Sequence, residues 1–383
     1  MSLVIKEIYF PPSFQMVESD QALADVCQKA AQSRHIALDT EFIRIRTFYP
    51  KLGLIQLYDG EQVSLIDPNK ISDFSPFIQL LANQNVVKVL HACKEDLEIF
   101  NHYFQQVPTP MMDTQVVAHF LGFGASAGFA SLVEQFFQLK LDKGASRTDW
   151  LARPLTDRQC RYAAADVWYL LPLYQQLDQQ LSQSSWKSAV QFECENLVKN
   201  SQQLKQADKA YLDIANSWRL NSLELMRLKL LAKWRYEEAI KRDLAQNFVV
   251  KAEHLWLLAK NDPKNISHLL ELGLSISEVR IHGKKMLQIL DQSRRSNKDD
   301  YPPPILRLAD DERYRPALKA LQQCLKEITP SDLPTDVLAT KRSLEALMKW
   351  CWFKKQDPND LPSLLKDWRR VFGRKLLQSL QNF

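Results

Sequence analysis

Short apolar segments alternate with polar turns in the first half of the chain. HIALDTEF (35–42), LGLIQLYD (52–59) and QVSLID (62–67) are rich in Ile, Leu and Val and predict three successive strands. VVKVLHA (86–92) predicts a further strand. The other segments have the apolar spacing of helices, at 72–84, 94–104, 113–121, 128–138 and 156–181. Hairpin-compatible strands followed by strand and helix units predict an α/β domain, with a mixed sheet and helices packed against it.

The hydrophobic pattern changes after about residue 182, where strand-like segments end. Residues 207–290 have the spacing of amphipathic helices rich in Leu, Ala and Trp, and the same pattern returns at 309–381. Between them, DQSRRSNKDDYPPP (291–304) is charged and ends in three prolines, which is typical of a linker. We therefore predict three domains: an α/β domain at 1–203 and two all-α domains at 204–292 and 293–383.

The composition is that of a globular protein, with 45% hydrophobic residues among 383. No apolar run is long enough to cross a bilayer, and MSLVIKEIYFPPSF at the start lacks the features of a signal peptide. The six cysteines are widely spaced and include no CxxC pair, which argues against a zinc site and a disulfide framework. We expect a cytoplasmic protein with reduced thiols and no membrane partner.

The net charge of +5 is unevenly distributed. Residues 1–200 contain 17 Lys and Arg against 22 Asp and Glu, whereas residues 201–383 contain 33 against 23. Acidic clusters bind metal ions and basic surfaces bind phosphates, so this asymmetry is compatible with a nucleic-acid enzyme. Ordinary solvated charge explains the same numbers.

Two carboxylates interrupt the first apolar strand. Asp39 and Glu41 stand at positions i and i+2, so both side chains project from the same face. Two like charges there cost free energy unless a cation compensates them. Oxygen clusters of this kind bind hard cations such as Mg²⁺ or Mn²⁺. The alternative is that the strand ends at Thr40 and leaves Glu41 in solvent.

Three further residues complete the acidic pattern. Asp96 lies in the first turn of a predicted helix, where the helix dipole alone favours an acidic residue, but also where strand ends and helix starts gather in α/β folds. Tyr162 and Asp166 are four residues apart on a predicted helix and share a face. A phenol beside a carboxylate suits a metal site with an oriented water, but also a core tyrosine beside a surface aspartate.

The order Asp-x-Glu, Asp, Tyr-x-x-x-Asp resembles the DEDD exonuclease superfamily in its tyrosine branch. The histidine branch would place His five residues before Asp166, where this chain has Arg161. The segments around the motif resemble the ribonuclease D family over residues 20–180, namely ALDTEFIRIRTFYPKLGLIQL, HACKEDLEIF, GFASLVEQFF, LDKGASRTDWLARPLT and YAAADVWYLLPLY.

This resemblance implies an RNase H-like fold and a 3′→5′ exoribonuclease that uses two divalent ions, Mg²⁺ or Mn²⁺, and releases nucleoside 5′-monophosphates. By motif, Asp39 would bridge both ions, Glu41 and Asp166 would complete the site of the ion that activates water, and Asp96 would help to bind the second ion. Tyr162 would orient the attacking water. The implied substrates are the 3′ ends of tRNA precursors and other small structured RNAs.

Three residues near these motifs are candidates for substrate contacts. Phe42 follows the Asp-x-Glu pair and could stack on a terminal base, or else pack in the core. Lys143 and Arg147 in LDKGASRTDW could contact the RNA backbone.

The helical half resembles HRDC domains. Residues 208–290 include NSLELMRLKLLAKWRYEEAIKRDLAQNFVVK, a long basic helix followed by a short segment expected to be extended. Its Leu and Trp spacing is explained by a buried core, and the excess of Lys and Arg on the other faces predicts phosphate contacts. Residues 305–383 are similar to a second, more divergent module with a basic segment, DWRRVFGRKLL (367–377).

Two other functions remain open at this point. A DNA exonuclease of the same superfamily would use the same phosphodiester chemistry. A non-catalytic RNA-binding protein on the same fold is the second, although such a protein should have lost at least one acidic ligand. The sequence has no GxxxxGK[ST] motif, which argues against an ATP-driven helicase, and we expect a monomer.

Overall fold

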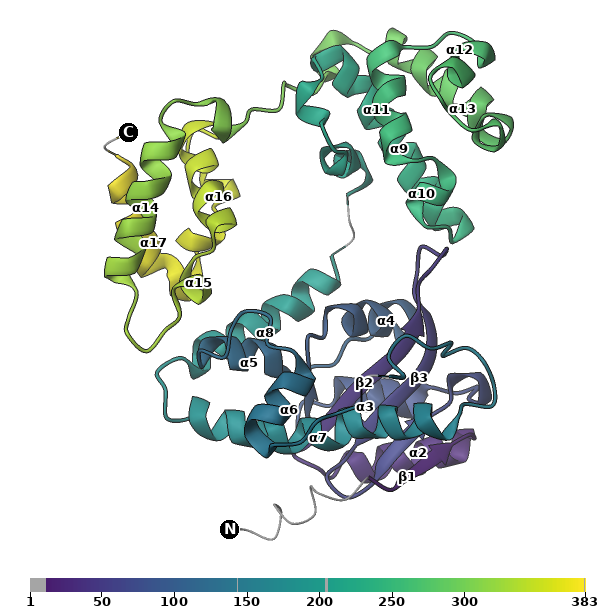
Figure 1. Ribbon diagram of the computed structural model, residues 1–383, viewed down its shortest axis with the longest axis vertical. Coiled ribbons are helices and arrows are strands. Elements are labelled where there is room, and N and C mark those ends of the chain that lie inside the picture. The colour runs from purple at the N-terminus through teal and green to yellow at the C-terminus, as the bar shows by residue number, and fades with distance from the viewer. Residues whose placement is uncertain (1–11, 143, 204–205, 382) are drawn as a thin grey trace. The chain divides into compact units, whose positions relative to one another are not determined.

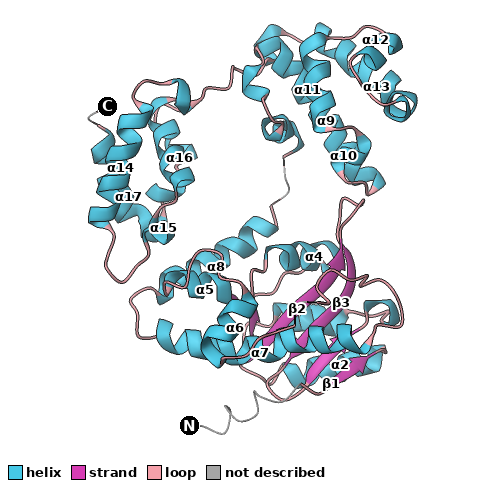
Figure 2. Cartoon of the chain, viewed as in Figure 1, coloured by secondary structure: helices cyan, strands magenta, loops and turns pink. Residues whose placement is uncertain are grey.

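The computed structural model describes residues 12–142, 144–203, 206–381 and 383. Within these residues, one six-stranded sheet has the strand order β1-β4-β3-β2-β5-β6. Figure 2 shows strands in magenta and helices in cyan. The strands are β1 (Phe14–Val17), β2 (His35–Ile43), β3 (Lys51–Tyr58), β4 (Val63–Ile66), β5 (Val87–Leu90) and β6 (Met111–Asp113). The four predicted strands are confirmed as β2 to β5, and β1 and β6 were not predicted.

The sheet is mixed, as predicted. β2, β3 and β4 form an antiparallel meander, because each is joined to the next by a short connection. The outer pairs are parallel: β1 with β4, β2 with β5, and β5 with β6. β3 is buried along almost its whole length, which explains its continuous apolar sequence.

Among the described residues up to position 203, seven α-helices accompany the sheet. α7 packs along one face and contacts β2, β3, β4 and β5 (Figure 1). A capping box between Thr156 and Gln159 fixes the start of α7, one turn before Tyr162. The helices are α2 (Asp20–Ala30), α3 (Ser75–Ala82), α4 (Lys94–Phe104), α5 (Thr114–Phe120), α6 (Phe129–Phe137), α7 (Asp157–Leu181) and α8 (Lys187–Ser201).

The chain divides into two compact units. One comprises Met1–Ile43, Lys51–Gln203 and Arg315–Phe383, and the other comprises Arg44–Pro50 and Leu204–Tyr314. We call them the sheet unit and the helical unit. Each contains segments that are distant in sequence, so neither is a single continuous stretch of chain. No helix among the described residues is long and apolar enough to cross a membrane.

The helical unit packs around α9. Its helices are α9 (Ser222–Arg242), α10 (Gln246–Val249), α11 (Ala252–Asn261), α12 (Ile266–Glu271) and α13 (Ile276–Arg295). Two arginines of the basic helix α9 are buried and support the fold, because Arg227 donates to the carbonyl of Ala259 and Arg235 to that of Val250. The NFVVK segment, expected to be extended, contains the helical turn α10 instead, and α13 continues into the predicted linker.

The tip of the β2–β3 hairpin belongs to the helical unit. The backbone N–H of Ala245 donates to the carbonyl of Arg46 at 2.8 Å, and the backbone N–H of Tyr49 donates to the Asp243 carboxylate at 3.0 Å. Phe48 stacks edge-on against Tyr236 of α9, with ring centroids 5.5 Å apart. Residues 44–50 are therefore held by backbone, polar and aromatic contacts within this unit.

The last helices join the sheet unit. They are α14 (Tyr314–Ile328), α15 (Thr335–Leu338), α16 (Lys341–Trp352) and α17 (Arg370–Leu380). Glu193 of α8 accepts a hydrogen bond from the indole of Trp368 at 2.8 Å and forms an ion pair with Arg369. These contacts explain why residues 315–383 group with the sheet rather than with the preceding helices.

Candidate active site

β2 presents two carboxylates on one face. It continues past Thr40 to Ile43, so the alternative in which the strand ends at Thr40 is wrong. Asp39 pairs with Gln56 of β3 and Glu41 with Leu54. A β-bulge follows between Glu41 and Phe42, which interrupts the ladder directly after the second carboxylate.

Asp96 reaches β2 from the first turn of α4. β5 pairs with β2 only as far as Ala37, so the later residues of β2 have no strand on that side. There the hydroxyl of Thr40 donates a hydrogen bond to the Asp96 carboxylate, which is only 7% exposed. The start of α4 is fixed by Asp113, whose carboxylate accepts the backbone N–H groups of Ala92 and Cys93, each at 3.0 Å.

Tyr162 and Asp166 come from α7. They lie one turn apart, and the Tyr162 hydroxyl hydrogen-bonds to the Asp166 carboxylate. The loop before α7 is anchored to the sheet by Arg153, which donates to Asp67 at 2.6 and 2.8 Å and to the carbonyl of Gly53 at 2.6 Å. The position of both candidate side chains is thus set by a capped helix and a tethered loop.

The pKa values of all four carboxylates are raised. Burial, and then the charge of Asp166, raises the pKa of Asp39. Burial together with Asp39, Asp166 and Asp96 raises the pKa of Glu41 to about 10. Burial and the charge of Asp39 raise the pKa of Asp96. For Asp166, burial raises the pKa to about 7 against the opposing hydrogen bond from Tyr162. Three distant segments therefore place their acidic groups in one electrostatic environment.

The donor set fits a hard divalent cation. Clustered, at least partly buried carboxylates resist ionisation unless a positive charge compensates them, and oxygen is the ligand that Mg²⁺ and Mn²⁺ prefer. Beside Asp39, the amide of Gln56 is fully buried and neither its oxygen nor its nitrogen has a hydrogen-bond partner. Such an orphaned group is typical of a site whose polar contacts are completed by a ligand or ordered water.

The described side chains do not form a complete set of metal ligands. Among the described residues, no group of three or more His, Cys, Asp and Glu side chains is positioned to hold a metal ion. Two of the carboxylates accept hydrogen bonds from hydroxyl groups: Asp96 from Thr40 and Asp166 from Tyr162.

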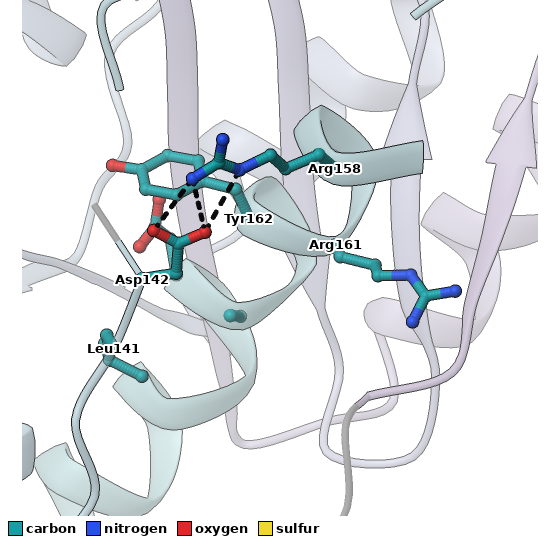
Figure 3. A pocket seen from close by; sticks show the side chains of 7 residues that line it. Leu141, Asp142, Arg158, Arg161 and Tyr162 are labelled. Atoms are coloured by element: carbon teal, nitrogen blue, oxygen red, sulfur yellow. Dashed lines mark hydrogen bonds and ion pairs between the residues drawn. The ribbon is translucent and has the colours of Figure 1, made fainter. Parts of the chain in front are cut away.

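A cavity of about 360 Å³ adjoins this cluster along α7 (Figure 3). Its described lining residues are Leu141, Asp142, Arg158, Arg161, Tyr162, Ala165 and Asp166. The cavity provides space for part of a substrate directly beside the phenol and one of the carboxylates.

The three predicted substrate contacts are not tested by the structure, which places only two of them. Phe42 is half-buried, directly after the bulge. Arg147 is exposed in the loop before α7 and is not among the described residues that line the cavity. Lys143 lies outside the described residues.

Three family models match successive parts of the chain. Residues 14–182 match the 3′-5′ exonuclease model, residues 224–290 the HRDC domain, and residues 313–377 the C-terminal HRDC domain of ribonuclease D. Over 380 residues the sequence is 51% identical to ribonuclease D of Haemophilus influenzae, covering 99% of this chain and 95% of that one. The chain belongs to the ribonuclease D family.

The match to ribonuclease D extends to structure. The Escherichia coli K12 protein is 44% identical over 371 residues, which is 97% of this chain and 98% of that one. The crystal structure of E. coli RNase D matches with a TM-score of 0.92 and covers 97% of this chain and 99% of that chain. The predicted RNase H-like exonuclease fold followed by HRDC domains is confirmed, and the protein is a 3′-5′ exoribonuclease.

Membership in the ribonuclease D family implies dependence on divalent metal ions and an RNA substrate. It also removes the alternative of a non-catalytic binding protein.

Sequence reasoning missed four residues that the structure places around the acidic cluster. Gln56 and Asp113 had no signal, because their partners are distant in sequence, and the Asp142–Arg158 pair was overlooked beside Lys143 and Arg147.

Proposed function

We propose that Asp39, Glu41, Asp96 and Asp166 hold two divalent ions, Mg²⁺ or Mn²⁺, for hydrolysis at the 3′ end of RNA. The observation that carries this proposal is the convergence of four carboxylates contributed by β2, α4 and α7. Asp39 and Glu41 share one face of β2, and Asp96 accepts a hydrogen bond from Thr40 between them. The helix that carries Asp166, α7, packs against β2. The charge of Asp166 raises the pKa of Asp39, and the charge of Asp39 raises the pKa of Asp96, so Asp39 lies near both and suits a ligand shared by both ions.

The residues of the site would then have different roles according to their positions. When bound, the ions would lower the pKa of water and stabilise charge on the reacting phosphodiester. Tyr162, whose hydroxyl already points to Asp166, would orient the attacking water by a hydrogen bond. Burial raises the pKa of Tyr162 above the ordinary value of a tyrosine, so this residue stays a neutral phenol and a hydrogen-bond donor at physiological pH. The product would be a nucleoside 5′-monophosphate.

We propose 3′ ends of tRNA precursors and other small structured RNAs as substrates. The E. coli relative is an exoribonuclease involved in structured RNA processing, which supports this choice. We further propose that the exonuclease domain predicted at 1–203 cuts the RNA and that the helical domains predicted at 204–292 and 293–383 bind it. Phe42, Lys143 and Arg147 remain proposed substrate contacts, and a cytoplasmic monomer that needs no ATP remains a prediction.

The test is digestion of a 3′-extended tRNA at increasing Mg²⁺ or Mn²⁺, with products resolved at single-nucleotide steps. We expect stepwise shortening from the 3′ end, no product in chelator, and release of 5′-monophosphates. Internal cleavage, or full activity in chelator, would refute the proposed mechanism. A 3′-extended DNA strand of the same sequence is the matched substrate, and comparable rates on both would favour the DNA alternative.

A further inference from the structure

The cavity beside Tyr162 is bordered by an exposed ion pair that the reaction itself does not use. The guanidinium of Arg158 donates from its Nε and Nη2 atoms to the Asp142 carboxylate, at 2.9 to 3.2 Å (Figure 3). Asp142 belongs to the loop before α7, and Arg158 to the first turn of α7. Both line the cavity.

The position of Arg158 relates it to the catalytic face. Arg158, Tyr162 and Asp166 are spaced at i, i+4 and i+8, so they follow one face of α7 at steps of about 6 Å along its axis. A strand whose reacting phosphate lies at Asp166 and Tyr162 can therefore continue along this face to Arg158. A guanidinium is well suited to bind a phosphodiester, because its N–H groups match two oxygens at once.

In this structure the guanidinium of Arg158 forms an ion pair with Asp142. The side chains of Arg158 and Asp142 are 64% and 65% exposed, so their ion pair is screened by water and contributes little to stability. Gly144 of the same loop also lies close to Arg158, since a Cβ added there would be 1.8 Å from its Nη2 atom. Arg161, in contrast, points away from this pair and is bound to Asp157 (Figure 3).

We propose that Arg158 binds a phosphodiester of the RNA strand next to the one being cut, and that Asp142 competes with the RNA for it. The carboxylate acts as an intramolecular substitute for phosphate, which lowers affinity for any strand that cannot displace it. This inference rests on the proposed function, because it takes the reacting phosphate to lie at Asp166 and Tyr162.

Opposite effects from the two partners distinguish this role from a structural one. We would measure binding of a 5′-fluorescein-labelled oligo(A) by anisotropy in chelator, and kcat and KM on the same RNA in Mg²⁺. Arg158→Gln should weaken binding and raise KM about tenfold, with kcat within about twofold, as expected for loss of one charged hydrogen-bond pair. Asp142→Asn should tighten binding and lower KM about threefold.

The matched control is the pair Asp178 and Lys187, near the other end of α7. Asp178 lies twelve residues after Asp166, about 18 Å along the helix, so Asp178→Asn makes the same charge change at a distance. We expect no change in affinity from Asp178→Asn, and the double variant Asp142→Asn/Arg158→Gln should match Arg158→Gln.

Two results would overturn the proposal: weaker binding by Asp142→Asn, which indicates a structural pair, or equal tightening by Asp178→Asn, which indicates net charge alone. Arg158→Lys covers the case in which Arg158→Gln unfolds, and it should weaken binding by less than tenfold. Binding in chelator does not depend on the metal site. If the variants showed the expected affinities but the wild-type protein were inactive, the proposed mechanism would be refuted and this inference would stand.

Discussion

The carboxylate of Asp113 receives the backbone N–H of Cys93 at 3.0 Å, and this contact fixes the first turn of the helix that carries Asp96. The same carboxylate also accepts the N–H groups of Ala92 and Gln115. A side chain that is not a proposed metal ligand therefore ties the end of β6 to the beginning of α4.

Asp113→Ala should lower both stability and activity. It leaves buried backbone N–H groups without acceptors, which costs about 3 kcal/mol in the free energy of unfolding, measured by urea denaturation. Because the turn that holds Asp96 loses its anchor, kcat should fall at least tenfold even where the variant is fully folded. Asp113→Asn keeps one acceptor oxygen, so its stability and activity should lie between those of the parent protein and of Asp113→Ala. A fully active Asp113→Ala protein would refute this positioning role.

Asp39→Asn should abolish RNA hydrolysis and leave RNA binding in place. The substitution removes the charge shared by the two proposed ions, so Mg²⁺ or Mn²⁺ should no longer raise the thermal unfolding temperature, which mass action predicts for the parent. Calorimetry with and without the ions measures this directly. The proposed ligand set is wrong if the variant retains the metal-dependent increase or the activity.

Gln56→Leu should stabilise the protein and reduce its activity. Both polar atoms of the buried Gln56 amide lack partners, so an apolar side chain of similar size removes a desolvation cost of about 1–2 kcal/mol. The amide lies beside Asp39 in the β2–β3 ladder, and we expect it to support the carboxylate once an ion is bound. A lower unfolding temperature, or unchanged apparent Mg²⁺ affinity, would contradict this prediction.

The ion pair between Asp67 and Arg153 should make stability depend on acidity. Burial alone would raise the pKa of Asp67, but hydrogen bonds from Arg153 and from the backbone of Asn69 outweigh it and lower the pKa. Since the folded pKa lies below the unfolded value of about 3.9, the pair stabilises the protein above that pH and the contribution is lost as the pH falls further.

Asp67→Asn should accordingly cost about 3 kcal/mol at pH 7, as for loss of one partner of a buried pair, and progressively less below about pH 4. Urea denaturation across pH 3 to 7 measures the difference. Asp149→Asn changes an exposed carboxylate in the neighbouring loop and should have no comparable effect. A cost for Asp67→Asn that does not change with pH would show that packing, not charge, is responsible.

RNA binding by the helical unit should depend on the exposed cations of α13. Replacing Arg280, Lys284 and Lys285 with Gln should weaken RNA binding and reduce the slope of log K against log salt by about 2, because three contacts to a single strand are lost. Fluorescence titration at several salt concentrations measures this slope. The buried Arg227 and Arg235 are excluded from this set because they support the fold.

The matched control replaces three lysines of the sheet unit, Lys29, Lys70 and Lys187. It changes the net charge by the same amount and should leave the slope almost unchanged. Equal slopes for both triple variants would indicate attraction by overall charge, without a specific surface on α13.

The sequence predicted most of the sheet because its central strands are apolar over several residues. β1 and β6 escaped notice because they have four and three residues, too few to establish an alternating pattern. The acidic residues were found because their spacing has chemical meaning at short range. The roles of Gln56 and Asp113 depend on neighbours far away in the chain, which no local pattern encodes.

Residues 44–50 leave the strand that carries Asp39 and Glu41, fold with the helical unit, and return to the sheet. The backbone therefore passes between the two units at four points: after residues 43, 50, 203 and 314. One proteolytic cut at any of these points leaves the other connections intact. Limited proteolysis of the native protein should thus yield nicked molecules whose fragments stay associated until they are denatured. A truncated protein that ends at residue 203 would lack the residues of the helical unit that contact the hairpin tip at 44–50.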